Sequence, residues 1–443
     1  MNTPICDFVE SYAQKNLIRA HIPGHKGKGL SGLENLDITE IVGADGLFCP
    51  DGIIAESERN AASVFGSART VYSTEGSTFS IKAMLYLTER YAVETAKNKL
   101  VFAVRNAHSS FIAGAVQNGL KVEWIVGDGN LLTQNVTPGD VDAALKQAEQ
   151  KPVAVYVTSP DYLGHIADVA GIKKVCERYG VLLIVDNAHG AYLKFLSRDI
   201  HPITLGADMC ADSAHKTLPC LGGGGYLHLN HSVYEVIGGY LPMAYSLFAS
   251  TSPSYLILRS LDKLNPYLDG EYSFDLKRLV EKLDEIKQKL KDKYVLVGEE
   301  PLKLTVDFKP YGYTGVEASG YLYEKGLVVE YADDDNVVMM FSTNTALDGL
   351  EKVYSILNEM PKKPAISRFS PKIALPERVM DVRDALLYPS ETVSLSEAVG
   401  RVFGANAVSC PPAVPVLYAG ELIGEKEKAL LEYYGGKKLR VVK

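Results

Sequence analysis

A lysine beside a glycine-rich turn is the residue of this chain best suited to covalent chemistry. Lys216 follows an apolar, strand-like run at 207–211 and precedes the glycines of 222–225. A lysine at the end of a sheet strand can point into a cleft, where its amine can form an imine with an aldehyde cofactor. The alternative is an ordinary lysine on a surface loop, and the segment alone does not choose between the two.

An acidic residue ends a second apolar run, thirty residues before this lysine. Asp186 directly follows the apolar run Val181–Val185. A carboxylate at the end of a buried strand is poorly explained by stability, because burying a charge is costly. An enzyme that uses pyridoxal phosphate (PLP) needs a carboxylate there to keep the pyridine nitrogen protonated. The alternative is an aspartate that caps the next helix.

Two further polar segments follow predicted strands. Gly76, Ser77 and Thr78 begin a predicted helix, and the amides, hydroxyls and dipole of such a helix start suit a phosphate group. A plain helix cap is the alternative for these residues. His108 follows the predicted strand Leu100–Val104, where its ring can stack on a flat cofactor, or it has only a structural role.

The four features together are stronger evidence for a cofactor site than any one of them alone. The phosphate turn, the histidine, the aspartate and the lysine each follow a predicted strand. Ligands of open α/β sheets bind along the edge where parallel strands end. We therefore predict that Lys216 holds PLP as a Schiff base, that Asp186 pairs with its ring nitrogen, and that His108 stacks on its ring.

The elements that must position these residues become regular near residue 69. Short runs rich in apolar and β-branched residues alternate with helical patterns, which predicts a mainly parallel α/β sheet buried on both faces. The predicted strands are Leu100–Val104, Val122–Val126, Val153–Thr158, Val181–Val185 and Gly225–Leu229, and the predicted helices between them are Phe79–Ala96, Val141–Gln150 and Ile172–Tyr179.

Composition divides the chain into four segments. Residues 1–50 are glycine-rich and irregular and are predicted to form an N-terminal arm, and residues 51–270 form the large cofactor-binding domain. Residues 271–362 are predicted to form a smaller α+β domain, which residues 363–443 complete. The elements predicted in this domain are a long amphipathic helix at Leu276–Lys293, strands at Leu302–Phe308 and Asn336–Ser342, and a helix near Gly315–Lys325.

Overall composition excludes several classes of protein. The 443 residues are 47% apolar and 23% charged with a net charge of -8, which predicts a globular protein without the basic surface that binds nucleic acid. We find neither a secretory signal pattern nor an apolar stretch of the roughly 20 residues that a membrane helix needs. The six cysteines lack paired spacing, so we expect reduced thiols in a cytoplasmic protein and no bound metal.

The motifs, taken as a set, resemble those of the Orn/Lys/Arg decarboxylases, a family of the fold-type-I, aspartate-aminotransferase-like PLP enzymes. They extend over nearly the whole chain, whose length is similar to that of the short bacterial members. The matching segments are Pro23-Gly-His-Lys-Gly27, Glu75-Gly-Ser-Thr78, Asn106-Ala-His108, Ser159-Pro-Asp-Tyr-Leu-Gly164, Asp186-Asn-Ala-His-Gly190, Ser213-Ala-His-Lys216, and Pro411-Pro-Ala-Val-Pro415 with Gly420-Glu421. The resemblance implies a seven-stranded, mainly parallel large domain and a smaller α+β C-terminal domain.

The resemblance also implies roles for individual residues. Ser213 and His215 would join Gly76, Ser77 and Thr78 around the phosphate. Ala188 would pack on the far face of the cofactor ring, and His189 would lie near the substrate. The family's active sites lie at a homodimer interface, so the arm around residues 21–28 would reach the partner's site. The sequence leaves a higher oligomer open. Three positions depart from the family pattern, namely Asn187, Gly223 and Ala413.

The reaction implied is the α-decarboxylation of a basic amino acid to an amine and CO2 in polyamine synthesis. Arginine is the first expectation, followed by lysine or ornithine. His215 or Lys216 would protonate Cα, and the distal cation of the substrate would meet Glu421 or, as a weaker choice, Asp333. A solvated hairpin turn is the simpler interpretation of residues 333–335.

Two other functions remain open from the sequence. The departures from the family pattern leave the PLP site intact but allow another fold-type-I enzyme, such as an aminotransferase or a lyase that acts on a different amino acid. A non-catalytic paralogue with a regulatory binding role is the other possibility, against which the intact Lys216, Asp186 and His108 argue.

Overall fold

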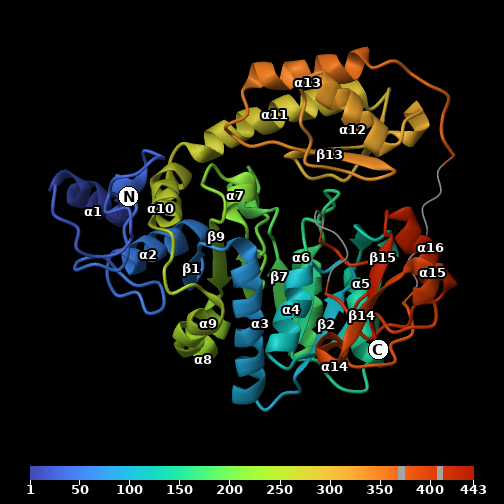
Figure 1. Cartoon of the computed structure of the whole chain (residues 1–443), viewed down its shortest axis with the longest axis horizontal. Helices are drawn as coiled ribbons and strands as arrows, with labels where there is room; N and C mark the ends of the chain where they lie inside the picture. The colour runs from blue at the N-terminus through green and yellow to red at the C-terminus, as the bar shows by residue number, and fades with distance from the viewer. Residues whose placement is uncertain (368–374, 407–412) are drawn as a thin grey trace. The chain divides into compact units, whose positions relative to one another are not determined.

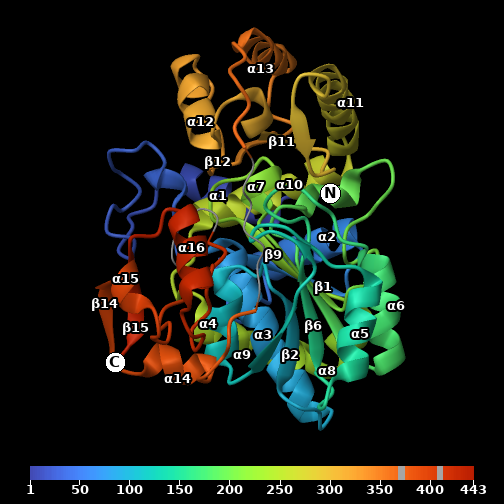
Figure 2. The same cartoon turned by 90° about the vertical axis from the view of Figure 1, so that its right-hand side faces the viewer.

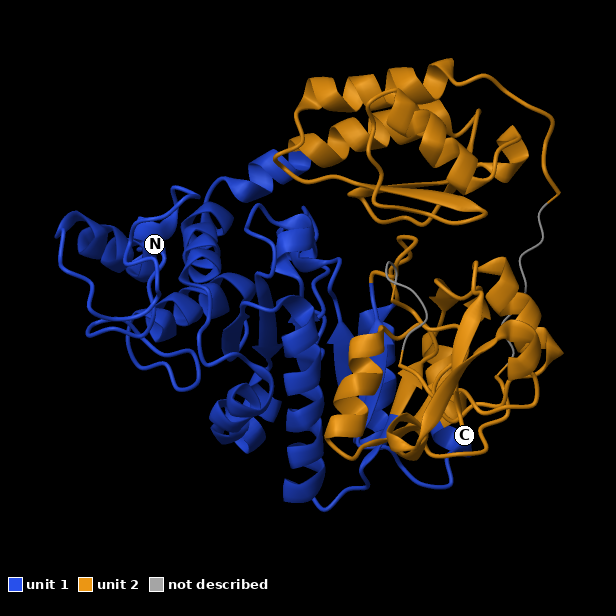
Figure 3. Cartoon of the chain, viewed as in Figure 1, with its two compact units in different colours: residues 1–101, 145–159, 168–277 blue, residues 102–144, 160–167, 278–443 orange. Residues whose placement is uncertain are grey.

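A computed structural model describes residues 1–367, 375–406 and 413–443 of the chain (Figure 1). The chain forms two compact units (Figure 3). Unit 1 comprises Met1–Val101, Leu145–Ser159 and Asp168–Lys277, and unit 2 comprises Phe102–Ala144, Pro160–Ala167 and Arg278–Lys443. The predicted boundaries at residues 50, 270 and 362 stay a prediction. Cys410 and two prolines of the C-terminal motif, Pro411 and Pro412, lie outside the described residues.

The largest sheet has seven strands in the order β1-β9-β8-β7-β6-β2-β3. Strands β6, β7 and β8 are parallel, while β9 is antiparallel to both β8 and β1, so β1 points the same way as β6 to β8. The prediction of a large, mainly parallel sheet is confirmed. The strands are β1 (Arg69–Ser73), β2 (Leu100–Val104), β3 (Lys121–Ile125), β6 (Ala154–Thr158), β7 (Leu182–Asp186), β8 (Met209–Asp212) and β9 (Gly225–Leu229).

Capping residues set the ends of the helices that follow these strands. Helix α6 (Val169–Tyr179) begins at Asp168, whose side chain accepts a hydrogen bond from the Gly171 amide. It ends at Gly180, whose φ of 66° is the left-handed conformation that glycine tolerates. The other helices of this region are α3 (Gly76–Glu94), α4 (Ser109–Gln117), α5 (Pro138–Gln147), α7 (Ala214–Thr217), α8 (His231–Ile237) and α9 (Leu241–Phe248).

The N-terminal residues are more regular than the sequence predicted. Helix α1 (Pro4–Gln14) buries Ile5, Cys6 and Val9, so the prediction that residues 1–50 are irregular was wrong over this helix. The Cys6 amide donates a hydrogen bond of 2.9 Å to Asp262 of helix α10 (Tyr255–Asp269). The helix was missed because no side chain caps its start locally, and the carboxylate that accepts from its first turn comes from Asp262, far along the chain. Helix α2 (Ile53–Phe65) follows it in unit 1.

Unit 2 contains a four-stranded antiparallel sheet in the order β10-β11-β13-β12. Its strands are β10 (Val295–Val297), β11 (Lys303–Asp307), β12 (Tyr331–Ala332) and β13 (Asn336–Met340). Helices α11 (Tyr272–Leu290), α12 (Gly315–Glu324) and α13 (Leu347–Glu359) lie on one face of this sheet (Figure 1 and Figure 2). The presence of a smaller α+β region after the large sheet confirms that prediction.

The C-terminal segment adds a two-stranded sheet to unit 2, and one apolar cluster includes Leu395, Leu417 and Leu439 together with Val338 of β13. No helix among the described residues is long and apolar enough to cross a membrane. The remaining elements are β4 (Asp128–Gly129), β5 (Gln134–Asn135), α14 (Val382–Leu387), β14 (Ser390–Ser394), α15 (Leu395–Ala398), α16 (Glu425–Tyr433) and β15 (Lys438–Val442).

Candidate active site

The predicted cofactor lysine lies at the edge of the large sheet, just after β8. Lys216 is half-buried in the single turn α7, and its Nζ lies 3.1 Å from Nε2 of His189. His189 belongs to the loop after β7, the parallel neighbour of β8. Because the carboxyl ends of parallel neighbours meet at one edge, the two loops that carry the predicted chemistry are brought together.

Asp186, the last residue of β7, is 2% exposed and held by two donors. Its Oδ2 accepts a hydrogen bond of 2.9 Å from the Tyr156 hydroxyl, and its Oδ1 accepts one of 3.1 Å from the Ala188 amide. The next helical turn begins after Gly190 and has no side-chain cap. Asp186 therefore does not act as a cap for that turn, and its carboxylate is fixed at the strand end.

The predicted phosphate turn is joined to the lysine loop through two hydroxyls. Ser213 Oγ donates to Ser77 Oγ at 2.8 Å, and the Ser77 amide donates to Ser213 Oγ at 3.3 Å. Gly76 has a φ of 63°, and a Cβ on it would lie 3.3 Å from Cε1 of His215. Ser77 is buried, whereas Thr78 is exposed in the first turn of α3. Four of the five residues predicted around the phosphate thus come together in unit 1.

The glycine-rich segment that departs from the family pattern packs against this turn. The Gly223 carbonyl accepts a hydrogen bond of 2.6 Å from the Gly76 amide. Gly223 has a φ of 97°, and a Cβ there would lie 2.7 Å from the Thr74 carbonyl oxygen. A larger residue at this position would therefore collide with backbone. The departure from the family pattern is a steric requirement of this chain's own turn.

His215 has one ring nitrogen fixed by the same segment. Its Nδ1 lies 2.8 Å from the carbonyl oxygen of Gly224. A carbonyl can only accept a hydrogen bond, so Nδ1 carries a proton. Nε2 is therefore the ring nitrogen through which neutral His215 can accept and return a proton.

His108 has a structural role in unit 2. It is the N-cap residue of α4, where its Nδ1 accepts a hydrogen bond of 3.1 Å from the Ser110 amide. This contact matches the structural alternative that the sequence left open. Stacking of the His108 ring on the cofactor stays a prediction.

Glu421 is already paired within unit 2. Its Oε2 lies 2.9 Å from Nη2 of Arg105 and accepts a hydrogen bond of 2.7 Å from the Tyr418 amide, and the Arg105 and Glu421 side chains are 1% and 2% exposed. Burial raises the pKa of Glu421, which Arg105 opposes. The carboxylate has a structural role here, and its contact with a substrate cation stays a prediction.

Asp333 begins a hairpin turn between β12 and β13, as the simpler interpretation predicted. Its Oδ1 accepts hydrogen bonds from the amides of Asp335 and Asn336 at 2.8 and 2.6 Å. The turn is solvated only in part, because the Asp334 side chain is 43% exposed whereas Asp335 is buried and lies 2.9 Å from Nζ of Lys309. The carboxylates are engaged inside unit 2, and a role of Asp333 toward the substrate stays a prediction.

The site residues of unit 1 fit PLP. Lys216 supplies the amine, the buried and oriented Asp186 suits a protonated ring nitrogen, and the start of α3 offers hydroxyls and helix amides to a phosphate. Gly76 leaves room where a Cβ would press on His215. Ala188 lies in the loop after β7 and its amide donates to Asp186, so a ring bound at Asp186 would lie near Ala188.

Sequence reasoning missed Tyr156, which orients the key carboxylate. It lies in β6 two residues before Thr158, which pairs with Asp186 in the parallel ladder. Residues two apart in a strand lie on the same face of the sheet. A tyrosine at that spacing in an otherwise apolar strand is the signal that could have identified it.

Comparison with known proteins supports the same chemistry. The family model for the major domain of Orn/Lys/Arg decarboxylase matches residues 3–297, and the model for the C-terminal domain of that family matches residues 369–437. Uncharacterized protein YaaO of Bacillus subtilis is 28% identical, over 96% of this chain and 92% of its own length. An arginine decarboxylase of Halalkalibacterium halodurans is 28% identical, over 97% of this chain and 92% of its own length.

Among solved structures, the lysine decarboxylase LdcF of Francisella novicida has the same fold. It superposes with a TM-score of 0.80 at 16% identity, covering 100% of this chain and 81% of that one. The predicted fold class is thereby confirmed.

Proposed function

This chain belongs to the Orn/Lys/Arg decarboxylase family, and from that premise we propose that its substrate is arginine, which it converts to agmatine and CO2. It is a PLP-dependent amino-acid decarboxylase. The observation that supports decarboxylation by this site is the meeting of Lys216 and His189 at the sheet edge where Asp186 is held. Arginine is preferred over lysine and ornithine because relatives covering nearly the whole chain are named arginine decarboxylases. Polyamine synthesis is the proposed use of the product.

Different residues of the chain have different roles in this reaction. PLP, when bound, supplies the sink for the electron pair left behind by CO2. The amine of Lys216 anchors the cofactor, and Asp186, itself held by Tyr156, keeps a proton on the ring nitrogen. Two groups are proposed as donors of the proton to Cα, namely Nε2 of His215 and the amine of Lys216.

A decarboxylation screen tests the substrate. With PLP supplied, we expect CO2 and amine from arginine with a kcat/KM roughly tenfold or more above that for lysine or ornithine, since a site built for a guanidinium leaves polar groups unpaired with the others. Mass spectrometry of the products checks the outcome. Keto-acid formation would instead identify an aminotransferase. Absence of product from all three, with no PLP absorption band, would favour the non-catalytic paralogue.

We further propose that the protein is a cytoplasmic homodimer in which the N-terminal arm contributes to the interface. Three apolar side chains of this region are almost fully exposed in the single chain, with relative exposures of 97% for Ile18, 106% for Leu30 and 101% for Val42. Apolar side chains exposed to this extent suit a segment that a partner chain covers. The five cysteines that the structure describes are free thiols, which suits a reducing compartment.

Sedimentation velocity over a range of concentrations tests the dimer. We expect a dimer for the unaltered protein and an at least tenfold weaker dimer for Leu30→Asp combined with Val42→Asp, because two charges would be buried on association. The matched control, Val93→Asp with Val295→Asp, places charges on exposed apolar positions elsewhere. A monomeric unaltered protein, or equal weakening by both pairs, would contradict the proposal.

A further inference from the structure

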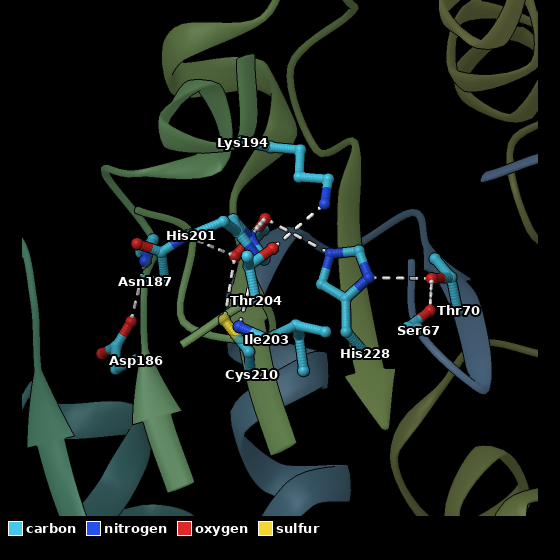
Figure 4. A network of polar contacts seen from close by, with 12 residues as sticks. Ser67, Thr70, Asp186, Asn187, Lys194, His201, Ile203, Thr204, Cys210 and His228 are labelled. Atoms are coloured by element: carbon cyan, nitrogen blue, oxygen red, sulfur yellow. Dashed lines mark hydrogen bonds and ion pairs between the residues drawn. The ribbon is translucent and has the colours of Figure 1, made fainter. Parts of the chain in front are cut away.

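A fully buried polar cluster lies where β7 and β8 end. At its centre is Asp212, the last residue of β8, whose side chain is 0% exposed. Its Oδ2 lies 3.0 Å from Nε2 of His201 and 3.3 Å from Nε2 of His228, both of which are also 0% exposed. Figure 4 shows His201 and His228 converging with Cys210 and Asn187 on this point. The reaction derived above uses none of these side chains directly.

The hydrogen bonds identify which atoms carry protons. Nδ1 of His201 accepts from the Ile203 amide at 3.4 Å, so its Nε2 carries the proton that faces Asp212. Nδ1 of His228 lies 2.8 Å from Oγ1 of Thr70, a hydroxyl that can donate to it. Both histidines can therefore be neutral and still donate to Asp212 through Nε2.

Asp212 carries a negative charge in the cluster. Burial alone would raise the pKa of Asp212, but interactions with His201 and His228 outweigh that effect and hold the pKa well below its usual range. Burial lowers the pKa of His228, which keeps this ring neutral. The cluster is thus a buried carboxylate whose acceptor sites are filled by donors.

A metal ion is the other occupant that these side chains suggest. His201, Cys210 and Asp212 each have a ligand atom within 4.8 Å of the others, among the described residues. A metal would need the Nε2 lone pair of His201, however, whereas the Ile203 amide directs the lone pair to Nδ1 and the proton to Nε2. The geometry is therefore that of a hydrogen-bonded cluster.

One bond connects this cluster to the cofactor site. Nδ2 of Asn187 donates to Oδ1 of Asp212 at 2.8 Å. Asn187 is 0% exposed, and its Oδ1 has no hydrogen-bond partner within the described part of the chain, so this bond alone fixes the side-chain amide. Asn187 stands between Asp186 and Ala188, while Asp212 directly precedes Ser213. The bond therefore joins the β7 loop to the β8 loop.

We propose that Asp212 is a positioning residue that, through Asn187, locks the loop carrying Asp186 against the loop carrying Lys216 and so sets the affinity for PLP. The role depends on the cofactor and not on which amino acid is the substrate. The role also accounts for Asn187, one of the three positions that depart from the family pattern. A carboxylate at position 212 requires a donor at 187, and an asparagine supplies that donor where a glutamate would not.

Asn187→Asp tests this role with an isosteric change. The new carboxyl would face Asp212, so burial and like charge raise the pKa of one of the pair, and a shared proton restores the bond only as the pH falls. The other titratable groups around it are Cys210, His201, His228 and Asp186, and Lys194 acts on His228 at longer range. We expect the dissociation constant for PLP to rise about tenfold or more at neutral and alkaline pH and to recover toward the unaltered value in acid.

PLP binding is measured by titration of the visible absorption band, so the result does not depend on any amino acid being a substrate. Asn265→Asp is the matched control, since Asn265 is equally buried in unit 1 and its amide also donates, to Ser57 and Tyr72. We expect it to lower the melting temperature without a pH-dependent change in PLP affinity. Unchanged affinity in Asn187→Asp, or a loss that is the same at every pH, would overturn the proposal, as would stoichiometric zinc in the purified protein.

Discussion

Replacing Lys216 with alanine is expected to abolish decarboxylation and the PLP absorption band together. The ε-amine is the group proposed to join the cofactor, and its Nζ lies 3.1 Å from His189. Another lysine near these strand ends, Lys194, has its amine bound to Asp199 and Thr204. Loss of a residue that forms the covalent link lowers kcat by several powers of ten, roughly 10³ or more. The measurements are CO2 release and the visible spectrum of the protein incubated with PLP.

Two variants separate the imine chemistry from charge and from folding. Lys216→Arg keeps a cation beside His189 but cannot form the imine, so it should be as inactive as the alanine variant. Lys173→Ala removes a lysine of the same unit that pairs with Asp208 at 2.8 Å, and it should keep the band and the activity. A Lys216→Ala protein that retains both would show that the cofactor is held elsewhere.

The sequence predicted the parts of the site that depend on local pattern. The strands at 100–104 and 225–229 were predicted to the residue, and Asp186 and Lys216 were placed at strand ends because buried apolar runs stop there. The residues that hold those groups were not predicted. Tyr156 reaches Asp186 from a neighbouring strand, and Asn187 reaches Asp212 across the ladder. Such pairs depend on strand order, which hydrophobic periodicity does not encode.

The same limit explains why the pairing of Glu421 was not predicted. Glu421 was proposed for the substrate because acidic residues suit a basic ligand, yet it pairs with Arg105, which is 316 positions away in the chain. The Arg105 guanidinium also lies 4.0 Å from the centre of the Tyr418 ring. A buried ion pair of this kind is visible only once the chain is folded, because neither residue carries a local signal of its partner.

Asp186→Asn is expected to lower kcat by about 10³ while leaving the PLP band in place. The amide keeps the shape of the side chain, since its Oδ1 can accept from the Ala188 amide and its Nδ2 can donate to the Tyr156 hydroxyl oxygen, but it no longer offers a negative charge to the ring nitrogen. Breaking a buried charge pair by removing one partner costs about 3–5 kcal/mol. Each 1.36 kcal/mol is a factor of ten in rate. Cofactor content is preserved in this variant because Lys216 is intact.

Single-turnover measurements with PLP-saturated protein check this prediction, and two variants calibrate it. Tyr156→Phe removes one donor but keeps the charge of Asp186, so we expect a smaller loss of about tenfold. Asp208→Asn makes the same substitution at another buried carboxylate of unit 1, one that binds Lys173 and the Leu183 amide. It should reduce stability and leave kcat unchanged. If Asp186→Asn were no slower than Tyr156→Phe, the charge of Asp186 would have no part in the reaction. The position of its side chain alone would then account for its effect on kcat.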